Sequence, residues 1–213
     1  MEEINSLKSR INREYFEYYA KYSLVMCISS KYKCLRKGES PDWQSDRLNM
    51  GVEVTRAIDK DIYLAYNIIN EYFGNVFMHN HIDEKINEIR ETYAKLLNIS
   101  EKEQIEYDDI QNIDNLKKSY LYKTVKLNKN YKKFAQNLLY MFTFKSMDEN
   151  EIYQCFDIDL SPYSVNFDIC FINCFDSLYI CDFTKKEISQ AIHVGEDTLR
   201  AVKDKALKKS RLE

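Results

Sequence analysis

The sequence predicts an α/β protein with a mixed central β-sheet flanked by helices, and α+β is the alternative class. Amphipathic helical segments alternate along the chain with short stretches whose composition is typical of strands. Only two prolines and four glycines occur among 213 residues, which favours long helices and ordered strands over linkers. The length suits one domain, which we place at residues 1–195, followed by a Lys-rich helix or frayed tail at 196–213.

Bulk properties narrow the environment in which the chain is expected to work. The formal net charge is −3, so binding to nucleic acid would depend on a local basic patch and not on a global positive field. No apolar run approaches the length of a membrane span, and the acidic start of the chain does not look like a signal peptide. The six cysteines include no Cys-x-x-Cys pair, so we expect free thiols and a cytoplasmic location.

Residues 3–25 are predicted to form the first helix. Apolar residues recur there at three- and four-residue spacing, namely at Ile4, Leu7, Ile11, Tyr18, Tyr22 and Val25. Glu14 lies on the same stripe, whereas Glu17 is expected on the exposed side. A glutamate such as Glu14 either reaches water at the edge of the buried face or takes part in a site. Residues 31–35 alternate weakly in polarity, which indicates an edge strand.

A β-hairpin is predicted at residues 39–58. Pro41 forces the preceding residue into an extended conformation, so a strand is expected to begin at Asp42. Residues 44–50 are polar and form the turn. Gly51 then enters the second strand at a position where no side chain fits.

The second strand of the hairpin carries a glutamate within a β-branched run. Side chains alternate along a strand, so Glu53 and Thr55 share one face and Val54 lies on the other. Burying Glu53 alone would be costly, and it therefore needs a cation or a donor beside it. Asp42 on the neighbouring strand can lie across from it. Two carboxylates and the Val54 carbonyl are the hard oxygen ligands that Mg²⁺ or Mn²⁺ prefers.

Pro41-Asp42, followed about ten residues later by Glu53-Val54-Thr55, resembles the PD-(D/E)XK signature of the restriction-endonuclease-like nuclease superfamily. Thr55 stands where that family usually has lysine. The resemblance implies a nuclease that hydrolyses phosphodiester bonds in DNA or RNA, with Mg²⁺ or Mn²⁺ held by Asp42, Glu53 and the Val54 carbonyl. It also makes Glu14 a candidate site residue, since the first helix of the family often supplies an acid. The plain alternative is an ordinary hairpin with a surface aspartate and a paired glutamate.

The middle of the chain is predicted to be helical. Apolar spacing indicates helices at 61–73 and 83–97, and the acidic segment 100–114 is expected to be a connector or a short helix. The histidines of His79-Asn80-His81 cannot jointly hold an ion on a strand, because adjacent side chains there point to opposite faces.

A long, lysine-rich helix is predicted at residues 116–141. Lys123 falls on its apolar stripe and Lys126 on the polar flank. Lys123 can therefore reach the carboxylates and supply the positive charge that Thr55 cannot, with Lys126 as the second candidate. The run Lys123-x-x-Lys126-Leu127-x-x-x-Tyr131 also resembles an element of uncharacterised members of the nuclease superfamily. The alternative is a solvated basic face whose aliphatic stems cover apolar surface.

The last third of the chain is predicted to combine a short helix, two strands and closing helices. Ser146 and Glu149 indicate a capped helix at 147–156, and 167–175 and 178–183 have the composition of two adjacent strands. Their cysteines are expected to be buried thiols and not metal ligands. Thr184 and Glu187 resemble a capping box for a helix that ends near Ile192.

The sequence is compatible with two functions from different classes. The first is a Mg²⁺- or Mn²⁺-dependent nuclease. The second is a catalytically impaired module of the same fold that binds nucleic acid or a protein partner, which Thr55 and the net charge of −3 favour. No membrane partner is expected, and a homodimer is compatible with the sequence. By analogy alone, a role in a phage-defence or mobile-element system is a third option.

Overall fold

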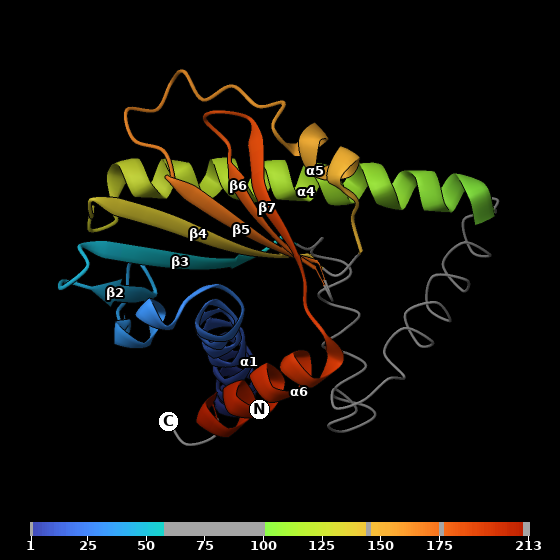
Figure 1. The fold of residues 1–213 in the computed structure, drawn as a ribbon. Coiled ribbons are helices and arrows are strands. Elements are labelled where there is room, and N and C mark those ends of the chain that lie inside the picture. The colour runs from blue at the N-terminus through green and yellow to red at the C-terminus, as the bar shows by residue number, and fades with distance from the viewer. Residues whose placement is uncertain (1, 58–100, 144–145, 175–176, 211–213) are drawn as a thin grey trace.

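The structure is a computed structural model that describes residues 2–57, 101–143, 146–174 and 177–210 (Figure 1). The helices predicted at 61–73 and 83–97 and the histidine string at 79–81 lie outside the described residues. No helix in the described ranges is both long enough and apolar enough to cross a membrane.

A seven-stranded mixed sheet forms the middle layer, and its strands lie side by side in the order of the chain. They are β1 (Arg36–Lys37), β2 (Trp43–Ser45), β3 (Met50–Arg56), β4 (Gln136–Thr143), β5 (Ile169–Cys174), β6 (Ser177–Asp182) and β7 (Glu187–His193). Strands β3, β4 and β5 are parallel to one another, and the other neighbours are antiparallel.

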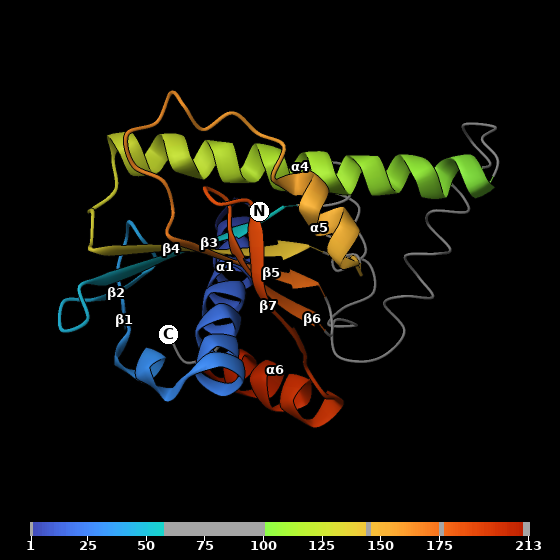
Figure 2. The same ribbon diagram turned by 45° about the horizontal axis from the view of Figure 1, so that its top comes forward.

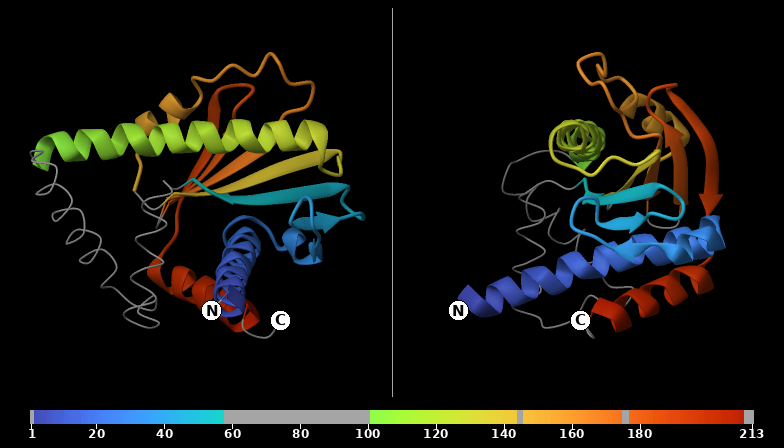
Figure 3. Two further views of the ribbon diagram at one scale, coloured as in Figure 1. Left: turned by 180° about the vertical axis from the view of Figure 1, so that it is seen from behind. Right: turned by 90° about the vertical axis from the view of Figure 1, so that its left-hand side faces the viewer.

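Helices cover both faces of this sheet (Figures 1 and 3). Helices α1 (Glu2–Ser23) and α6 (Glu196–Ser210) lie on one face, and α4 (Glu101–Lys129) and α5 (Glu149–Cys155) lie on the other. The predicted α/β class with a mixed central sheet flanked by helices is therefore confirmed at this level.

Strand alternation divides the core between the two faces of the sheet. The α1 face is lined by Met50, Val52, Val54, Leu138, Tyr140, Phe142 and Phe171. The α4 face is lined by Leu139, Met141, Cys170, Ile172, Cys174 and Cys181. Helix α6 packs beside α1 and adds Val202 and Ala206 to the first of these clusters (Figure 2). The C-terminal segment, for which the sequence allows a helix or a frayed tail, is a helix up to Ser210.

The connection from α1 to the hairpin is helical, and the edge strand predicted at 31–35 is wrong. A π-helical turn, Leu24–Ile28, continues α1, and a 3-10 helix, Ser30–Cys34, follows it. The Ser29 hydroxyl caps the second turn by accepting a hydrogen bond from the Lys31 N–H. Tyr32 and Leu35 are buried at a three-residue spacing, which a 3-10 turn satisfies better than a strand does.

Helix α4 and strand β4 correct the prediction of one helix at 116–141. The helix begins at Glu101, so the segment 100–114 is not a connector, and it ends at Lys129. Residues 136–143 form the central strand β4. That strand is buried on both faces from Asn137 onward, so its apolar run carries no period that distinguishes a strand from a helix.

The helix predicted from Thr184 to Ile192 is also wrong, because this segment is a hairpin. The Asp182 carboxylate accepts hydrogen bonds from the N–H groups of Thr184 and Lys185, and Lys186 has a φ of 57°. A polar turn with one left-handed residue thus leads into β7. The short helix predicted at 147–156 is present as α5, but its cap is Asp148 with Glu151 and not Ser146 with Glu149.

The two strands predicted near 167–175 and 178–183 are confirmed as neighbours. Cys170 pairs directly with Cys181 across β5 and β6. These two thiols are buried together with Cys155 and Cys174, as expected, and burial raises the pKa of each of the four. In the described ranges, no group of three or more His, Cys, Asp or Glu side chains is arranged to hold a metal ion.

Gly51 marks the closest approach between the hairpin and the start of β4. A Cβ at this position would lie 2.6 Å from the ring of Phe134 and 2.6 Å from Cγ of Pro41. The expectation that no side chain fits here is therefore confirmed, and the reason is the packing of two rings against the backbone.

We expect Gly51→Ala to lower the free energy of unfolding by about 1–3 kcal/mol, because both rings must move to admit the methyl group. Gly195→Ala is the matched control, since no heavy atom lies within 4 Å of the added Cβ. That control should cost less than about 1 kcal/mol, the effect of helix capping alone. Urea unfolding followed by circular dichroism measures both, and equal effects would contradict the packing argument.

Candidate functional site

Two buried carboxylates lie level with each other on neighbouring strands. The antiparallel register pairs Trp43 of β2 with Val52 of β3, which brings Asp42, just before Trp43, opposite Glu53. Asp42 is 3% exposed and Glu53 is 4% exposed. Burial of two acids in such proximity is costly unless donors or cations surround them. The structure therefore has to supply partners for both.

Asp42 is held between the hairpin and α1. Its Oδ2 accepts a hydrogen bond of 2.8 Å from the Val54 N–H, at the point where the β2–β3 ladder ends. Its Oδ1 accepts a hydrogen bond of 3.1 Å from the Arg13 guanidinium. Val54 thus fixes the Asp42 carboxylate through its N–H, while its carbonyl is the ligand that the family resemblance implies.

Glu53 points toward α4 and the turn that follows this helix. Its Oε1 accepts a 2.5 Å hydrogen bond from the Lys123 ammonium and a 2.7 Å hydrogen bond from the Tyr131 hydroxyl. The Lys123 side chain is only 13% exposed, so this ion pair is largely shielded from water. The other carboxylate oxygen, Oε2, is buried and accepts no hydrogen bond in the described structure. Glu53 therefore has one oxygen with two donors and one buried oxygen whose acceptor capacity is unused.

The electrostatics show that the two acids interact. Burial raises the pKa of Glu53, and the nearby charge of Asp42 raises it further, while Lys123 and Tyr131 act in the opposite direction. Burial and the hydrogen bond to Glu53 raise the pKa of Tyr131, with the charge of Asp42 adding to the effect. Tyr131 consequently stays protonated and acts as a donor. Asp42 thus exerts its charge on the residues of the α4 side as well as on Arg13.

Glu14 and Glu17 of α1 are both buried, which corrects the expectation that Glu17 is exposed. Glu17 accepts a 2.7 Å ion-pair hydrogen bond from Arg13, the same residue that binds Asp42. Lys37 of β1 lies 3.3 Å from Glu14 and 3.7 Å from Glu17. Burial and the charge of Asp42 raise the pKa of Glu17. Glu17 is buried because Trp43 packs on this turn of α1 and donates a hydrogen bond to the Glu17 carbonyl.

The four buried carboxylates lie in two sets of ion pairs in the described part of the chain. Arg13 and Lys37 pair with Glu14, Glu17 and Asp42, and Lys123 pairs with Glu53. The charge of Asp42 acts on Glu53, whose Oε2 has no hydrogen-bond partner, and a small divalent cation would neutralise this pair of acids. Mg²⁺ is commonly held by only one or two carboxylates while it keeps several waters. The donor set therefore fits Mg²⁺ or Mn²⁺.

The remaining predicted site residues lie at the margin of this network. Thr55 is half-buried on β3, two residues after Glu53 and on the same face of the strand. Lys126 is half-buried and its ammonium lies 4.5 Å from the centre of the Tyr122 ring, not on Glu53. Of the two lysines that the sequence offered, Lys123 is thus the one in contact with a hairpin carboxylate.

No role was predicted for Arg13, and Tyr131 was named only as the last residue of the run that resembles an element of the nuclease superfamily. The spacing of Arg13 and Glu17 is that of an i, i+4 ion pair, a signal that is present but does not point toward a hairpin. The helix predicted at 116–141 includes Tyr131, but α4 ends at Lys129 and Tyr131 lies in the turn beyond it. Its hydroxyl reaches Glu53 only because this turn folds back over β3.

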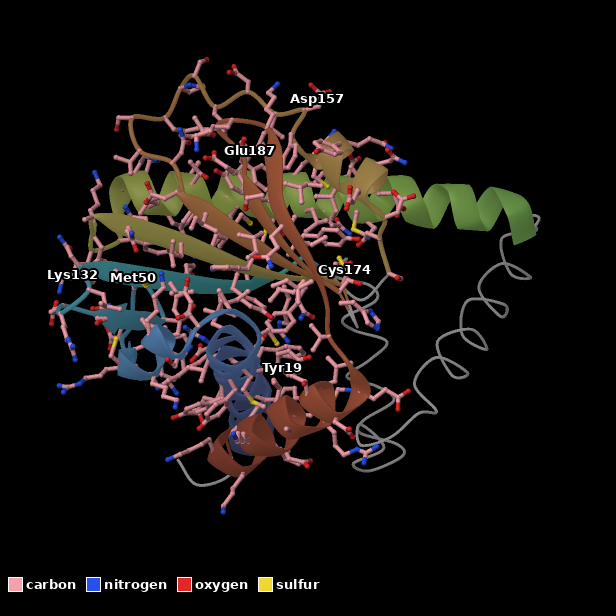
Figure 4. The ribbon with its side chains drawn as sticks, viewed as in Figure 1. Tyr19, Met50, Lys132, Asp157, Cys174 and Glu187 are labelled. Atoms are coloured by element: carbon pink, nitrogen blue, oxygen red, sulfur yellow. The ribbon has the colours of Figure 1, made fainter. Side chains whose placement is uncertain are left out.

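The turn after α4 is fastened to the hairpin next to the site. The Lys132 N–H donates to the Ser40 carbonyl at 3.2 Å, and the Lys132 ammonium lies 2.8 Å from Asp46 in the hairpin turn. Figure 4 shows Lys132 and Met50 at the same end of the sheet. These bonds hold Tyr131, the residue before Lys132, in reach of Glu53.

Comparison of the chain with protein-family models, with curated proteins and with solved structures finds no match in any of the three. The interpretation of this site therefore depends on its own geometry and on the sequence motif.

We expect Lys123→Met to lower the free energy of unfolding by about 3 kcal/mol near neutral pH, because it leaves the Glu53 carboxylate buried without its cation. The pKa of Glu53 is already above its ordinary value of 4.5, and loss of Lys123 raises it further. The folded state then holds the proton more tightly than the unfolded chain, so the penalty is full above the folded-state pKa and disappears as the pH falls toward 4.5.

Urea unfolding at about pH 8 and about pH 5 tests this dependence, with Lys126→Met as the matched control on the same helix. The control should change stability by less than about 1 kcal/mol at either pH, since Lys126 contacts an exposed ring. The buried ion pair is contradicted if Lys123→Met loses little free energy of unfolding at about pH 8, or if it loses as much at about pH 5.

Proposed function

We propose that this protein is a Mg²⁺- or Mn²⁺-dependent phosphodiesterase that cuts DNA or RNA. The observation that carries the proposal is that Asp42 and Lys123 both act on the buried Glu53, one of whose carboxylate oxygens, Oε2, has no hydrogen-bond partner. A mixed sheet flanked by helices agrees with a restriction-endonuclease-like core, and the Pro-Asp and Glu-x-Thr strings resemble the signature of that superfamily.

Asp42 and Glu53 would hold the ion, with the Val54 carbonyl as the third protein ligand. A divalent ion bound there would supply a Lewis acid for the scissile phosphate and a more acidic water as the nucleophile. The hydrogen bonds of Lys123 and Tyr131 both go to Oε1 of Glu53, which orients the carboxylate and leaves Oε2 for the ligand. The Val54 N–H and Arg13 orient Asp42 by binding one oxygen each, and a carboxylate oxygen with one donor keeps a lone pair for an ion.

Lys123 is the residue that replaces the missing family lysine in this proposal. Its ammonium is held beside Glu53 in a largely water-excluded position, where a positive charge stabilises a phosphate or a developing oxyanion more strongly than at the surface. Thr55 would support a water molecule through its hydroxyl, which is a weaker task than that of a lysine. Lys126, which lies over the Tyr122 ring, would contact the substrate, and Glu14 would hold Lys37 through their ion pair.

A second candidate function is a non-catalytic module that binds nucleic acid or a protein. The specific observation that favours it is the direct Lys123–Glu53 ion pair, since a lysine that neutralises Glu53 lowers the need for a metal ion. The substitution of threonine for lysine at position 55 points the same way. A cytoplasmic location and a homodimer remain predictions under both functions.

We expect purified protein to nick or degrade nucleic acid with Mn²⁺ or Mg²⁺ and not with EDTA. Asp42→Asn and Glu53→Gln should each lower the rate by at least about a hundredfold, because each removes an oxygen ligand of the ion. Glu39→Gln is the matched control, because this glutamate lies in the same segment, 39–58, but is exposed. Supercoiled plasmid, linear duplex, single-stranded DNA and RNA are the substrates, and rates unchanged in both site variants would overturn the proposal.

Calorimetric titration with Mn²⁺ separates the two functions. The nuclease proposal expects one site whose affinity falls at least about tenfold in Glu53→Gln and in Asp42→Asn and is unchanged in Glu39→Gln. If no heat of binding depends on the two hairpin acids, the non-catalytic module becomes the better interpretation.

A further inference from the structure

A ridge of lysines with one tyrosine runs along α4 beside the site. Lys118, Tyr122, Lys126 and Lys129 recur at intervals of four, four and three residues, so they line one side of the helix. Lys118, Tyr122 and Lys129 are exposed, and Lys126 is half-buried. We call these four residues the Lys–Tyr ridge. It forms a local positive surface on a chain whose net charge is negative.

Tyr122 is a large ring in an exposed position. Its exposed fraction of 58% is the highest among the large hydrophobic side chains that the structure describes. The Lys126 ammonium lies 4.5 Å from the ring centre, which places a positive charge on the aromatic surface. An exposed aromatic ring flanked by ammonium groups is the combination with which proteins bind single-stranded nucleic acid: bases stack on the ring and phosphates approach the cations.

The Lys–Tyr ridge borders the carboxylate site. Tyr122 directly precedes Lys123, whose ammonium binds Glu53. Tyr122 also interacts electrostatically with Tyr131, the second donor to Glu53, and with Lys123. A nucleic-acid strand with one phosphate near Asp42 and Glu53 would therefore have its neighbouring nucleotides next to Tyr122.

We propose that the Lys–Tyr ridge is the binding platform for a single-stranded nucleic acid, with one base stacked on Tyr122 and the backbone along Lys118, Lys126 and Lys129. The proposal rests on the proposed function in that it places the same strand across the carboxylate site. A base within a duplex is stacked and paired, so its face is not free to lie on a tyrosine. The platform therefore selects unpaired nucleotides over duplex.

Binding of fluorescein-labelled oligonucleotides of about 20 nucleotides, followed by fluorescence anisotropy in EDTA, tests the platform without cleavage of the probe. The probes are one single-stranded DNA, the RNA of the same sequence, and the DNA duplex. Tyr122→Ala should weaken binding of the single strands about tenfold, the effect of losing one stacked base, and change duplex binding less than about twofold. Tyr122→Phe keeps the ring and should bind as the unaltered protein does.

Tyr153→Ala is the matched control, because Tyr153 is also an exposed tyrosine at 49% but lies on α5 against Phe156. It should leave all affinities unchanged. The arms with DNA and RNA show which single strand is preferred. The platform is overturned if Tyr122→Ala and Tyr122→Phe bind single strands with the same affinity. It is also overturned if Tyr122→Ala lowers the affinities for single strand and duplex by the same factor, or if no probe binds.

These outcomes are independent of catalysis. If the protein binds single strands through Tyr122 but cuts no substrate, the platform stands and the phosphodiesterase proposal is overturned. If cleavage depends on Asp42 and Glu53 but Tyr122→Ala leaves binding unchanged, the proposed function stands and the platform is overturned.

Discussion

The buried carboxylate of Glu53 is the constraint on which the site depends. A glutamate that is 4% exposed in the second strand of a hairpin cannot stay charged without partners, and the partners it has come from residues 70 and 78 positions further along the chain. Lys123 and Tyr131 can reach it only if α4 crosses this face of the sheet and the chain then turns back at Lys129. The parallel pairing of β3 with β4 follows from the same turn, since β4 begins directly after it.

The hairpin is in turn held by contacts on both of its sides. Asp42 closes the end of the β2–β3 ladder and binds α1 through Arg13, while the turn after α4 is bonded to Ser40 and Asp46. Gly51 lets the rings of Pro41 and Phe134 approach the backbone at the same place. The two acids are therefore fixed by backbone and side-chain bonds before any ligand arrives, which is the kind of preorganisation that catalysis or tight binding requires.

Charge is distributed unevenly around this site. Four buried carboxylates lie on α1 and the hairpin in the described part of the chain, whereas lysines recur on the adjoining surface of α4. A net charge of −3 conceals this separation, because it averages an acidic interior site and a basic ridge. A pair of buried acids suits a divalent ion and a basic helix surface suits a phosphodiester backbone, and both proposals use this arrangement.

The sequence by itself determined the local features: the hairpin with Gly51, the faces of β3, the neighbouring strands β5 and β6, and Lys123 as the lysine able to turn inward. These follow from alternation, helical spacing and turn chemistry, which act over a few residues. Only the tertiary structure decided that 136–143 is a central strand, that Glu17 is buried, and that Tyr131 and Arg13 bind the two acids. A strand that is buried on both faces, such as β4, has no alternation of apolar and polar residues by which it can be recognised. Contacts such as Tyr131–Glu53 depend on how distant segments pack, and the local residue pattern does not contain that information.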